Sequence, residues 1–319
     1  MWVIFDGNYL LHRVMHLPAY QQMRTHDGRF SGGIFGVLTT LGSVLSNISA
    51  TRAILVWDGR HSERRKQLCP EYKEGRKPHD DPNFDYRAEF QYSRSNLGWF
   101  LKALGIRNVR CKQREADDVI YQIRRSLRAE SPDSWVSVVS DDRDMIQLVD
   151  DRCSIYRPRA QEWVRAGSMQ EMTGARDREE FLFLKAMQGD KSDNIAGVPG
   201  IGEVRARRLL TALHPSIDAA RKQWQPPLDM RVAVEGASLK DTWAMRVRKN
   251  WKTVLRNLEL VDMAREVFMV EELAQISESM SGKRGFEDDE LIRTLLRDWS
   301  MHSLLLNVVS WVRPFTRLR

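Results

Sequence analysis

The chain has 319 residues, of which 42% are hydrophobic and 29% are charged, and this composition is typical of a folded globular protein rather than a disordered one. Its formal net charge of +7 at pH 7 favours a polyanionic partner such as a nucleic acid, without identifying one. No apolar run approaches the roughly 20 residues that span a bilayer, so an integral membrane protein is not expected.

The N-terminus and the cysteines indicate the compartment. The chain begins with an apolar strand pattern and lacks the basic, apolar and small-residue order of a secretory signal, so a cytoplasmic location is expected. The three cysteines, Cys69, Cys111 and Cys153, are scattered and odd in number, which indicates neither a disulfide framework nor a zinc site.

Strands and helices are expected to alternate over the first half of the chain. The apolar runs Trp2 to Phe5 and Ala53 to Trp57 each end at an Asp-Gly pair and are predicted to be buried parallel strands, with a crossover helix at 33–49 between them. Further strands are predicted at 106–111 and 135–139, and further helices at 88–104 and 116–128. This order predicts an α/β core with a doubly wound parallel sheet. The inner face of the helix at 88–104 is expected to consist of Phe90, Leu97, Phe100, Leu101 and Leu104.

Acidic residues gather where the predicted strands end and where the helix at 116 begins. Ligands of parallel sheets bind outside the carboxyl ends of the strands, so we expect these acids to converge. Taken singly, each also fits a helix cap, an acidic first turn or a solvated turn. Crowded together they would repel one another, and hard oxygens without His or Cys suit two Mg²⁺ or Mn²⁺ ions. The candidate metal ligands are Asp6, Asp58, Glu115, Asp117, Asp118, Asp142, Asp144, Asp190 and Asp193.

The stretch GVPGIG at 197–202 lies between two apolar helices and is followed by arginines. Glycines allow close backbone approach to a phosphate, and the N–H groups that open the next helix face outward. Glycines also mark ordinary turns, but the following arginines favour binding of a duplex backbone, which carries no base information. The residues expected to contact DNA here are Gly197, Gly200, Ile201, Gly202, Arg205, Arg207 and Arg208.

The segment 60–77 is basic, is interrupted by Pro70 and is expected to project from the core as a mobile or partly helical segment. In isolation it fits a solvated charged loop. Beside a site that needs an anionic substrate, we interpret it as a clamp on single-stranded nucleic acid, in which Tyr72 stacks on a base and Arg64 and Arg65 bind the strand.

Five ordered motifs between Trp2 and about Leu210 resemble those of the 5′ nucleases, a family that comprises flap endonucleases, the 5′-exonuclease domains of bacterial DNA polymerase I and phage 5′-exonucleases. They are VIFDGNYLLHR with LVWDG, EYKEGRKP, EADD, SDDRDMIQLV, and GDKSDNIAGVPGIG. The resemblance implies a PIN-like nuclease core at 1–180 with a helical arch at about 60–95. It also implies a helical DNA-binding subdomain at 181–319, with a helix-three-turn-helix (helix-hairpin-helix) motif at about 183–211.

The resemblance also assigns roles to the acids and to the arch. One ion would be held by Asp6, Asp58, Glu115 and Asp117, and the second would be served, partly through water, by Asp142, Asp144, Asp190 and Asp193. Asp118 matches an extra acid of phage and bacterial members, and Asp117 also counts among the catalytic groups. Lys73 and Arg76 match arch residues that steer and polarise the scissile phosphate, and the hairpin would hold a K⁺ ion by its carbonyls. The motif SDDRD leaves two registers, Asp141 or Asp142, of which DMIQL favours Asp142.

The activity implied by the resemblance is that of a Mg²⁺-dependent 5′-3′ exonuclease and flap endonuclease with RNase H activity. Its substrates would be branched or 5′-flapped DNA and RNA·DNA hybrids, cut by a monomer in replication or repair. The enzyme would act in the cytoplasm of the host cell if a phage encodes the chain. Without a recognisable sliding-clamp peptide or polymerase domain, the chain resembles stand-alone phage enzymes, and residues 212–319 are expected to complete the helical subdomain and contact replication proteins. Two alternatives stay open, an inactive relative that binds branched DNA and a PIN-type ribonuclease.

Overall fold

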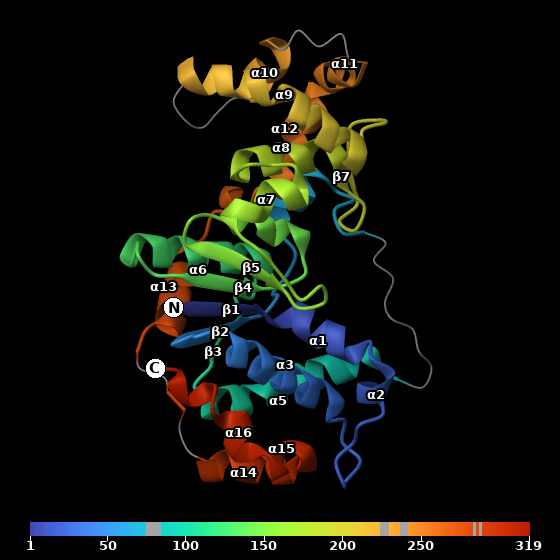
Figure 1. The fold of residues 1–319 in the computed structure, drawn as a ribbon. Coiled ribbons are helices and arrows are strands. Elements are labelled where there is room, and N and C mark those ends of the chain that lie inside the picture. The colour runs from blue at the N-terminus through green and yellow to red at the C-terminus, as the bar shows by residue number, and fades with distance from the viewer. Residues whose placement is uncertain (75–83, 224–229, 237–241, 283–284, 287–288) are drawn as a thin grey trace. The chain divides into compact units, whose positions relative to one another are not determined.

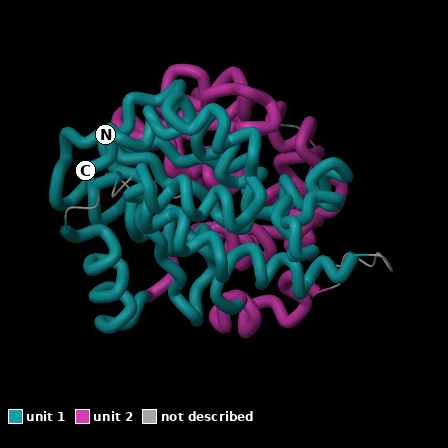
Figure 2. Tube along the Cα trace, turned by 90° about the horizontal axis from the view of Figure 1, so that it is seen from below, with its two compact units in different colours: residues 1–60, 77–141, 268–319 teal, residues 61–76, 142–267 magenta. Residues whose placement is uncertain are grey.

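The computed structural model describes residues 1–74, 84–223, 230–236, 242–282, 285–286 and 289–319. The chain forms two compact units, each built from distant parts of the sequence (Figure 2). Unit 1 comprises residues 1–60, 77–141 and 268–319, and unit 2 comprises residues 61–76 and 142–267. This division differs from the boundary expected near residue 180, because the C-terminal residues pack on unit 1 and the segment 61–76 belongs to unit 2.

Unit 1 contains four parallel strands in the order β3-β2-β1-β4. They are β1 (Trp2–Asp6), β2 (Arg52–Val56), β3 (Arg107–Val109) and β4 (Val136–Val139). Their apolar runs are buried, which is the pattern of strands covered on both faces of a sheet. All four strands were predicted, and the largest difference is that β3 is shorter than the predicted run at 106–111.

Helices cover both faces of these strands. Figure 1 shows α6 on one face and α1, α3 and α5 on the other. The predicted inner face of α5 is confirmed, because Phe90, Leu97, Phe100, Leu101 and the following Leu104 are all buried. The helices of unit 1 are α1 (Gly7–Met15), α2 (Pro18–Gln21), α3 (Gly32–Asn47), α5 (Tyr86–Ala103), α6 (Ala116–Glu130), α13 (Val270–Met280), α14 (Asp289–Asp298), α15 (His302–Leu306), α16 (Val308–Val312) and η3 (Phe315–Arg317).

Unit 2 is mostly helical and carries two small antiparallel hairpins. The hairpins are β5 (Cys153–Arg157) with β6 (Glu162–Val164), and β7 (Gly189–Asp190) with β8 (Ile195–Ala196). Helix α8 packs against both α12 and α9. The helices of unit 2 are α4 (Glu63–Leu68), η1 (Arg143–Leu148), α7 (Ala166–Thr173), α8 (Arg178–Gln188), α9 (Glu203–Gln223), α10 (Met230–Gly236), α11 (Thr242–Lys249), α12 (Trp251–Val261) and η2 (Met263–Arg265).

The basic segment differs from its prediction. It is partly helical, as α4, but it packs into unit 2 instead of projecting. Tyr72 is 3% exposed and lies in an apolar cluster with Leu182 and Leu260. Because a buried ring cannot stack on a base, the predicted role of Tyr72 is wrong.

The two arginines of α4 are likewise structural. Arg65 is 3% exposed, and its Nε donates to the carbonyl of Leu260, 195 residues further along the chain, at 2.9 Å. Arg64 Nε donates to Glu266 at 3.0 Å. The two guanidinium groups therefore tie α4 to the end of α12 and to Glu266 shortly beyond it. Arg65 is too buried for its predicted contact with DNA, whereas the contact of Arg64, whose side chain is 26% exposed, stays a prediction. Arg76, the other predicted arch residue, lies outside the described residues.

The cysteines and the membrane-spanning potential of the helices were also considered in the sequence. The three cysteines, all among the described residues, are buried and have free thiols. Within the described part of the chain, none of the helices combines the length and the apolar character that a bilayer span requires.

Candidate metal and nucleic-acid site

Asp6 is fixed at the carboxyl end of β1, where it caps α1. Its carboxylate accepts hydrogen bonds from the backbone N–H of Tyr9 at 2.9 Å and from the hydroxyl of Ser140 at 3.0 Å. The chain turns sharply here, and Gly7 is needed because a Cβ would lie 2.9 Å from the ring of Trp57. With 5% of its surface exposed, Asp6 is held in one orientation at the edge of the sheet.

Asp58 joins the end of β2 to the start of α6. Its Oδ1 accepts from the backbone N–H of Ala116 at 2.6 Å. In the parallel pairing of β1 with β2, Asp6 lies opposite Val56, so the two strand-end aspartates are neighbours. The acids that open α6 differ in exposure, since Glu115 and Asp118 are buried and Asp117 is half-buried. The five acids predicted in this part of the chain therefore lie at the ends of neighbouring strands and at the start of α6.

The two candidate aspartates of the SDDRD motif have different partners. Asp141 accepts a hydrogen bond from the hydroxyl of Tyr9, and burial together with this bond raises the pKa of Tyr9. Asp142 instead begins η1, and its Oδ1 accepts from the backbone N–H of Asp144 at 2.8 Å. This difference favours Asp142 as the residue that acts with the acids of unit 2.

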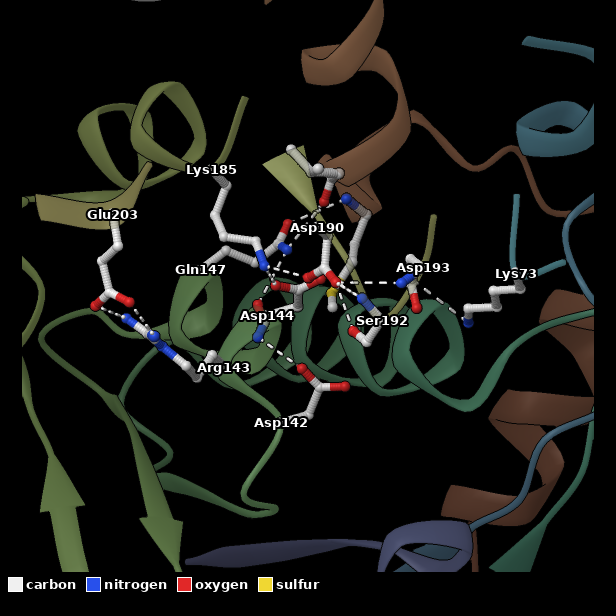
Figure 3. A network of polar contacts seen from close by, with 12 residues as sticks. Lys73, Asp142, Arg143, Asp144, Gln147, Lys185, Asp190, Ser192, Asp193 and Glu203 are labelled. Atoms are coloured by element: carbon white, nitrogen blue, oxygen red, sulfur yellow. Dashed lines mark hydrogen bonds and ion pairs between the residues drawn. The ribbon is translucent and has the colours of Figure 1, made fainter. Parts of the chain in front are cut away.

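In unit 2, the ammonium of Lys185 lies between two of the predicted ligands (Figure 3). Its Nζ is 2.5 Å from Asp144 Oδ1 and 2.7 Å from Asp190 Oδ2. Asp190 Oδ1 also accepts from the backbone N–H of Asp193 at 3.2 Å. Asp193 in turn lies 3.9 Å from Nζ of Lys73, the predicted arch residue. Asp144 and Asp190 thus share one cation, and a second lysine stands beside the same group of acids.

Burial and the ammonium of Lys185 shift the pKa values of the acids around it. Burial raises the pKa of Asp144 to about 6, although Lys185 opposes the shift. Burial would raise the pKa of Asp190 too, but Lys185 and hydrogen bonds from Ser192 outweigh it and lower that pKa to about 2. Burial would lower the pKa of Lys185, whereas the two carboxylates raise it, so the amine stays charged.

The chemistry of these side chains fits a divalent cation, since carboxylate oxygens are the ligands that Mg²⁺ and Mn²⁺ prefer. As the side chains stand, no three His, Cys, Asp or Glu residues in the described part of the chain are grouped so that they could hold a metal ion. In unit 2 the positive charge comes from Lys185 instead. The two-ion site therefore stays a prediction.

The glycine-rich hairpin follows β7 and β8 and leads into α9. Gly197 is required by close packing, because a Cβ there would lie 2.3 Å from the carbonyl oxygen of Gln188. Gly200 has a φ of +76° and a carbonyl that accepts from Arg205 Nη1 at 2.8 Å. Arg246 of α11 also reaches this glycine, since a Cβ added to it would lie 2.2 Å from Arg246 Nη1. Two arginines therefore converge on the turn.

The other residues that were predicted to contact DNA, in the hairpin and at the start of α9, differ from one another in burial and in hydrogen bonding. Ile201 is 3% exposed, and its N–H donates to the carbonyl of Val198 at 2.9 Å. Because both the side chain and the N–H of Ile201 are used inside the turn, its predicted contact with phosphate is wrong. Arg207 donates to the carbonyl of Met172 and lies 3.3 Å from Glu203, while Arg208 and the backbone of Gly202 are exposed.

Sequence reasoning missed three cations. Lys185 stands five residues before Asp190, a spacing that was visible but was not connected with the acids. Arg143 separates Asp142 from Asp144 and donates to Glu203 at 2.9 Å and 3.1 Å. This bond from Arg143 is the largest cause that lowers the pKa of Glu203. Arg246 gave no usable signal, because only the fold brings α11 to the hairpin.

Comparisons with known sequences agree with the resemblance. Residues 1–176 match a family model described as the 5′-3′ exonuclease, N-terminal resolvase-like domain. The chain is 32% identical over 209 residues to the 5′-3′ exonuclease of Buchnera aphidicola, which covers 65% of the chain and 69% of that protein. It is 28% identical over 275 residues to DNA polymerase I of Mycobacterium tuberculosis, covering 83% of the chain but 27% of the polymerase. The chain thus spans about a quarter of the length of such polymerases.

Solved structures show the same fold. The 5′-exonuclease of phage T5 with bound zinc has a TM-score of 0.66 and 22% identity, over 88% of this chain and 97% of that chain. The T5 flap endonuclease in a complex with DNA and metal ions has a TM-score of 0.63 and 19% identity, over 98% and 99%. Flap endonuclease-1 from Methanococcus jannaschii has a TM-score of 0.56 and 15% identity, over 98% and 92%. The predicted fold class, a PIN-like parallel-sheet core with helices, is confirmed.

Proposed function

Because the chain belongs to the 5′-3′ exonuclease family, we propose that it is a divalent-metal-dependent, structure-specific 5′ nuclease. It hydrolyses phosphodiester bonds near junctions between single strand and duplex, on branched or 5′-flapped DNA and on RNA·DNA hybrids. The biological setting that we propose is removal of RNA primers and flaps in replication or repair. The T5 flap endonuclease, solved with DNA and metal ions, supports the proposal by its similar fold.

The observation that carries the proposal is the cation shared by Asp144 and Asp190. Oxygens of both carboxylates lie within 2.7 Å of one ammonium nitrogen, so the fold already brings two acids to a single positive charge. Carboxylates forced together in this way favour a bound cation over separate ionisation. Mg²⁺, when bound, would activate water and stabilise the charge that develops on the leaving oxygen.

The residues of the chain would orient the substrate and the ligands. Hydrogen bonds from Ser140 to Asp6 and from Ala116 to Asp58 fix these carboxylates before any cation binds, which lowers the cost of assembling the site. Lys73 lies beside Asp193, where it could draw a phosphate toward the acids. The hairpin at 197–202 would hold the duplex by its backbone, with Arg205 next to it.

Replacing Asp190 by Asn tests the proposal. With a labelled 5′-flap substrate and Mg²⁺, we expect cleavage to fall by about 100-fold or more, since one of the proposed ligands loses its charge. Binding of the same DNA in Ca²⁺ should be retained. The matched control is Asp218→Asn, which removes a half-exposed carboxylate of unit 2 that pairs with Arg176 at 2.8 Å. The control variant should cleave like the wild type.

Other outcomes would identify the alternatives. Wild-type protein that binds flapped DNA in Mg²⁺ or Mn²⁺ without cutting it would be an inactive branched-DNA binder. Preference for single-stranded RNA in a panel of flapped, nicked, gapped and RNA·DNA substrates would indicate a PIN-type ribonuclease. Unchanged cleavage by the Asp190→Asn variant would remove this residue from the site.

A further inference from the structure

We infer that Arg143 and Arg207 form a binding site for a backbone phosphate of duplex DNA, and that the carboxylate of Glu203 fills this site when DNA is absent. The inference rests on the proposed function, because its ligand is a phosphodiester of the substrate. It gives a role to Arg143, which lies in the motif SDDRDMIQLV but had no predicted role, and it makes Glu203 a competitor of DNA for the same site.

Two guanidinium groups converge on the one carboxylate. Arg143 donates through both terminal nitrogens, to Glu203 Oε1 at 2.9 Å and to Oε2 at 3.1 Å. Arg207 Nη2 lies 3.3 Å from the same Oε1. A forked guanidinium binds two oxygens of a carboxylate or of a phosphate in the same geometry. A phosphodiester, with two free oxygens and one negative charge, can therefore take the place of the Glu203 carboxylate.

The three side chains are exposed enough for a phosphate to replace the carboxylate of Glu203. The side chains of Arg143, Arg207 and Glu203 are 40%, 33% and 45% exposed. Ion pairs at such exposure contribute little to stability, so displacing the carboxylate costs the protein little. Arg207 is meanwhile held by its bond to the carbonyl of Met172, which keeps its guanidinium in place when Glu203 leaves.

The site lies between two parts of the proposed machinery. Arg143 is flanked by Asp142 and Asp144 (Figure 3). In the sequence, Glu203 follows directly after the glycine-rich hairpin. A phosphate bound by Arg143 and Arg207 would sit next to both the hairpin and the acid-bearing turn η1. The exchange of Glu203 for DNA would thereby fix the duplex relative to these acids.

A simpler reading is that Glu203 only stabilises the first turn of α9 and forms a surface ion pair with Arg143. The two readings predict opposite changes in affinity. If Glu203 only supports the helix, its neutralisation leaves DNA binding unchanged or weakens it. If Glu203 occupies the phosphate site, its neutralisation frees two guanidinium groups and strengthens binding.

The experiment compares Glu203→Gln with wild type in fluorescence anisotropy of a nicked duplex with a 5′ flap, with Ca²⁺ in place of Mg²⁺. We expect Kd to fall about 3- to 10-fold, and the slope of log K against log salt to steepen by about 1, as for one added phosphate contact. The matched control is Glu162→Gln, which makes the same charge change in an Arg–Glu pair, with Arg157 at 2.5 Å and with 40% of the Glu162 side chain exposed. It should change Kd by less than about 2-fold, through screened long-range charge alone.

A double variant keeps the test independent of folding. In Glu203→Gln/Arg143→Ala, the gain in affinity should disappear, whereas thermal unfolding should confirm that all variants are folded. The inference is overturned if Glu203→Gln binds no more tightly than Glu162→Gln, or if the gain survives loss of Arg143. A wild-type chain that fails to bind the flapped duplex would instead contradict the proposed function, so the two failures can be told apart.

Discussion

The acids of the two units are held by different kinds of donor. In unit 1, Asp6 accepts from a backbone N–H and from the hydroxyl of Ser140, and Asp58 accepts from the backbone N–H of Ala116. In unit 2, Asp144 and Asp190 meet on the ammonium of Lys185. A neutral donor orients a carboxylate and leaves its negative charge in place, whereas an ammonium also compensates that charge.

This difference has a consequence for cation binding. A divalent cation that reaches Asp144 and Asp190 must compete with the ammonium of Lys185, which pairs with both carboxylates. The metal-free form of unit 2 should therefore depend on Lys185, and added metal should reduce that dependence. Four substitutions test how far the contrast holds.

The largest effect is expected from Lys185→Met. Lys185, Asp144 and Asp190 have side chains only 7%, 19% and 16% exposed, so removing the ammonium leaves two mostly buried carboxylates without their shared cation. In EDTA the free energy of unfolding should fall by about 2 to 4 kcal/mol. In Mg²⁺ a large part of that loss should be recovered, because a divalent ion replaces the ammonium. Urea unfolding under both conditions measures this.

Lys191→Met is the control, because Lys191 is an exposed lysine of the neighbouring turn. It should be nearly as stable as wild type in both conditions. An equal loss for Lys185→Met with and without Mg²⁺ would mean that no metal takes over from the ammonium, and the proposed difference between the units would then be lost.

The next effect concerns pH. The pKa of Asp144 is raised to about 6 in the folded state, from 3.8 for an isolated group, so the folded state binds the proton more tightly over this interval. Stability of the metal-free protein should therefore fall as pH rises from about 4 to 6, by on the order of 2 kcal/mol. Asp190 acts in the opposite sense, but at lower pH, since its pKa is lowered to about 2.

Asp144→Asn should remove this slope. Denaturant unfolding in EDTA, at several pH values between about 4 and 7, compares the variant with wild type. If the unfolding free energies of the two proteins changed with pH in parallel, Asp144 would titrate as an ordinary surface carboxylate. Mg²⁺ should also flatten the wild-type slope, because cation binding favours the ionised carboxylate over the whole interval.

A smaller effect is expected in unit 1, from Ser140→Ala. The hydroxyl is fully buried and donates to Asp6, which is 5% exposed, so its loss leaves a buried carboxylate oxygen without this donor. The cost should be about 1 to 2 kcal/mol. Ser46→Ala is the control, because that hydroxyl donates to the carbonyl of Gly42 within its own helix at 2.7 Å. Equal stability of the two variants would show that the Ser140 bond does not hold Asp6.

The first group of acids was accessible to sequence reasoning because its signals are local. Buried parallel strands require apolar runs, and an acid followed by glycine marks the point where the run ends, as at Asp6 and Asp58. The same local pattern predicted α5 and its buried face. Such signals survive in a single sequence because they depend on neighbours a few residues away.

The acids of unit 2 were also predicted, but the packing of Tyr72 and the cations that accompany these acids were not accessible in the same way. Tyr72 stands in a basic stretch and looks exposed, but its packing partners Leu182 and Leu260 lie far along the chain. Lys185 and Arg143 reveal their roles only when the fold brings acids from separate turns to the same nitrogen. A charge that compensates other charges leaves no period or motif, and sequence reasoning therefore found the acids and missed the cations that accompany them.

The smallest change in stability is expected from Lys73→Met, which separates compensation from catalysis. Lys73 is also a lysine next to an acid of unit 2, but its Nζ lies 3.9 Å from Asp193, farther than Lys185 lies from either of its partners. The Lys73 and Asp193 side chains are only 9% and 15% exposed, but the attraction across 3.9 Å is weak and is largely offset by the desolvation of both charges, so the loss in unfolding free energy should stay below about 1 kcal/mol. If Lys73 draws the scissile phosphate to the acids, cleavage of a 5′-flap substrate should nevertheless fall by about 10- to 100-fold, because a charge that acts on the reacting group is lost. Lys66→Met, in the exposed part of the same segment, should change neither quantity. A variant of Lys73 that loses stability as Lys185→Met does, and cleaves normally once folded, would make it a second compensating cation and leave the phosphate to other residues.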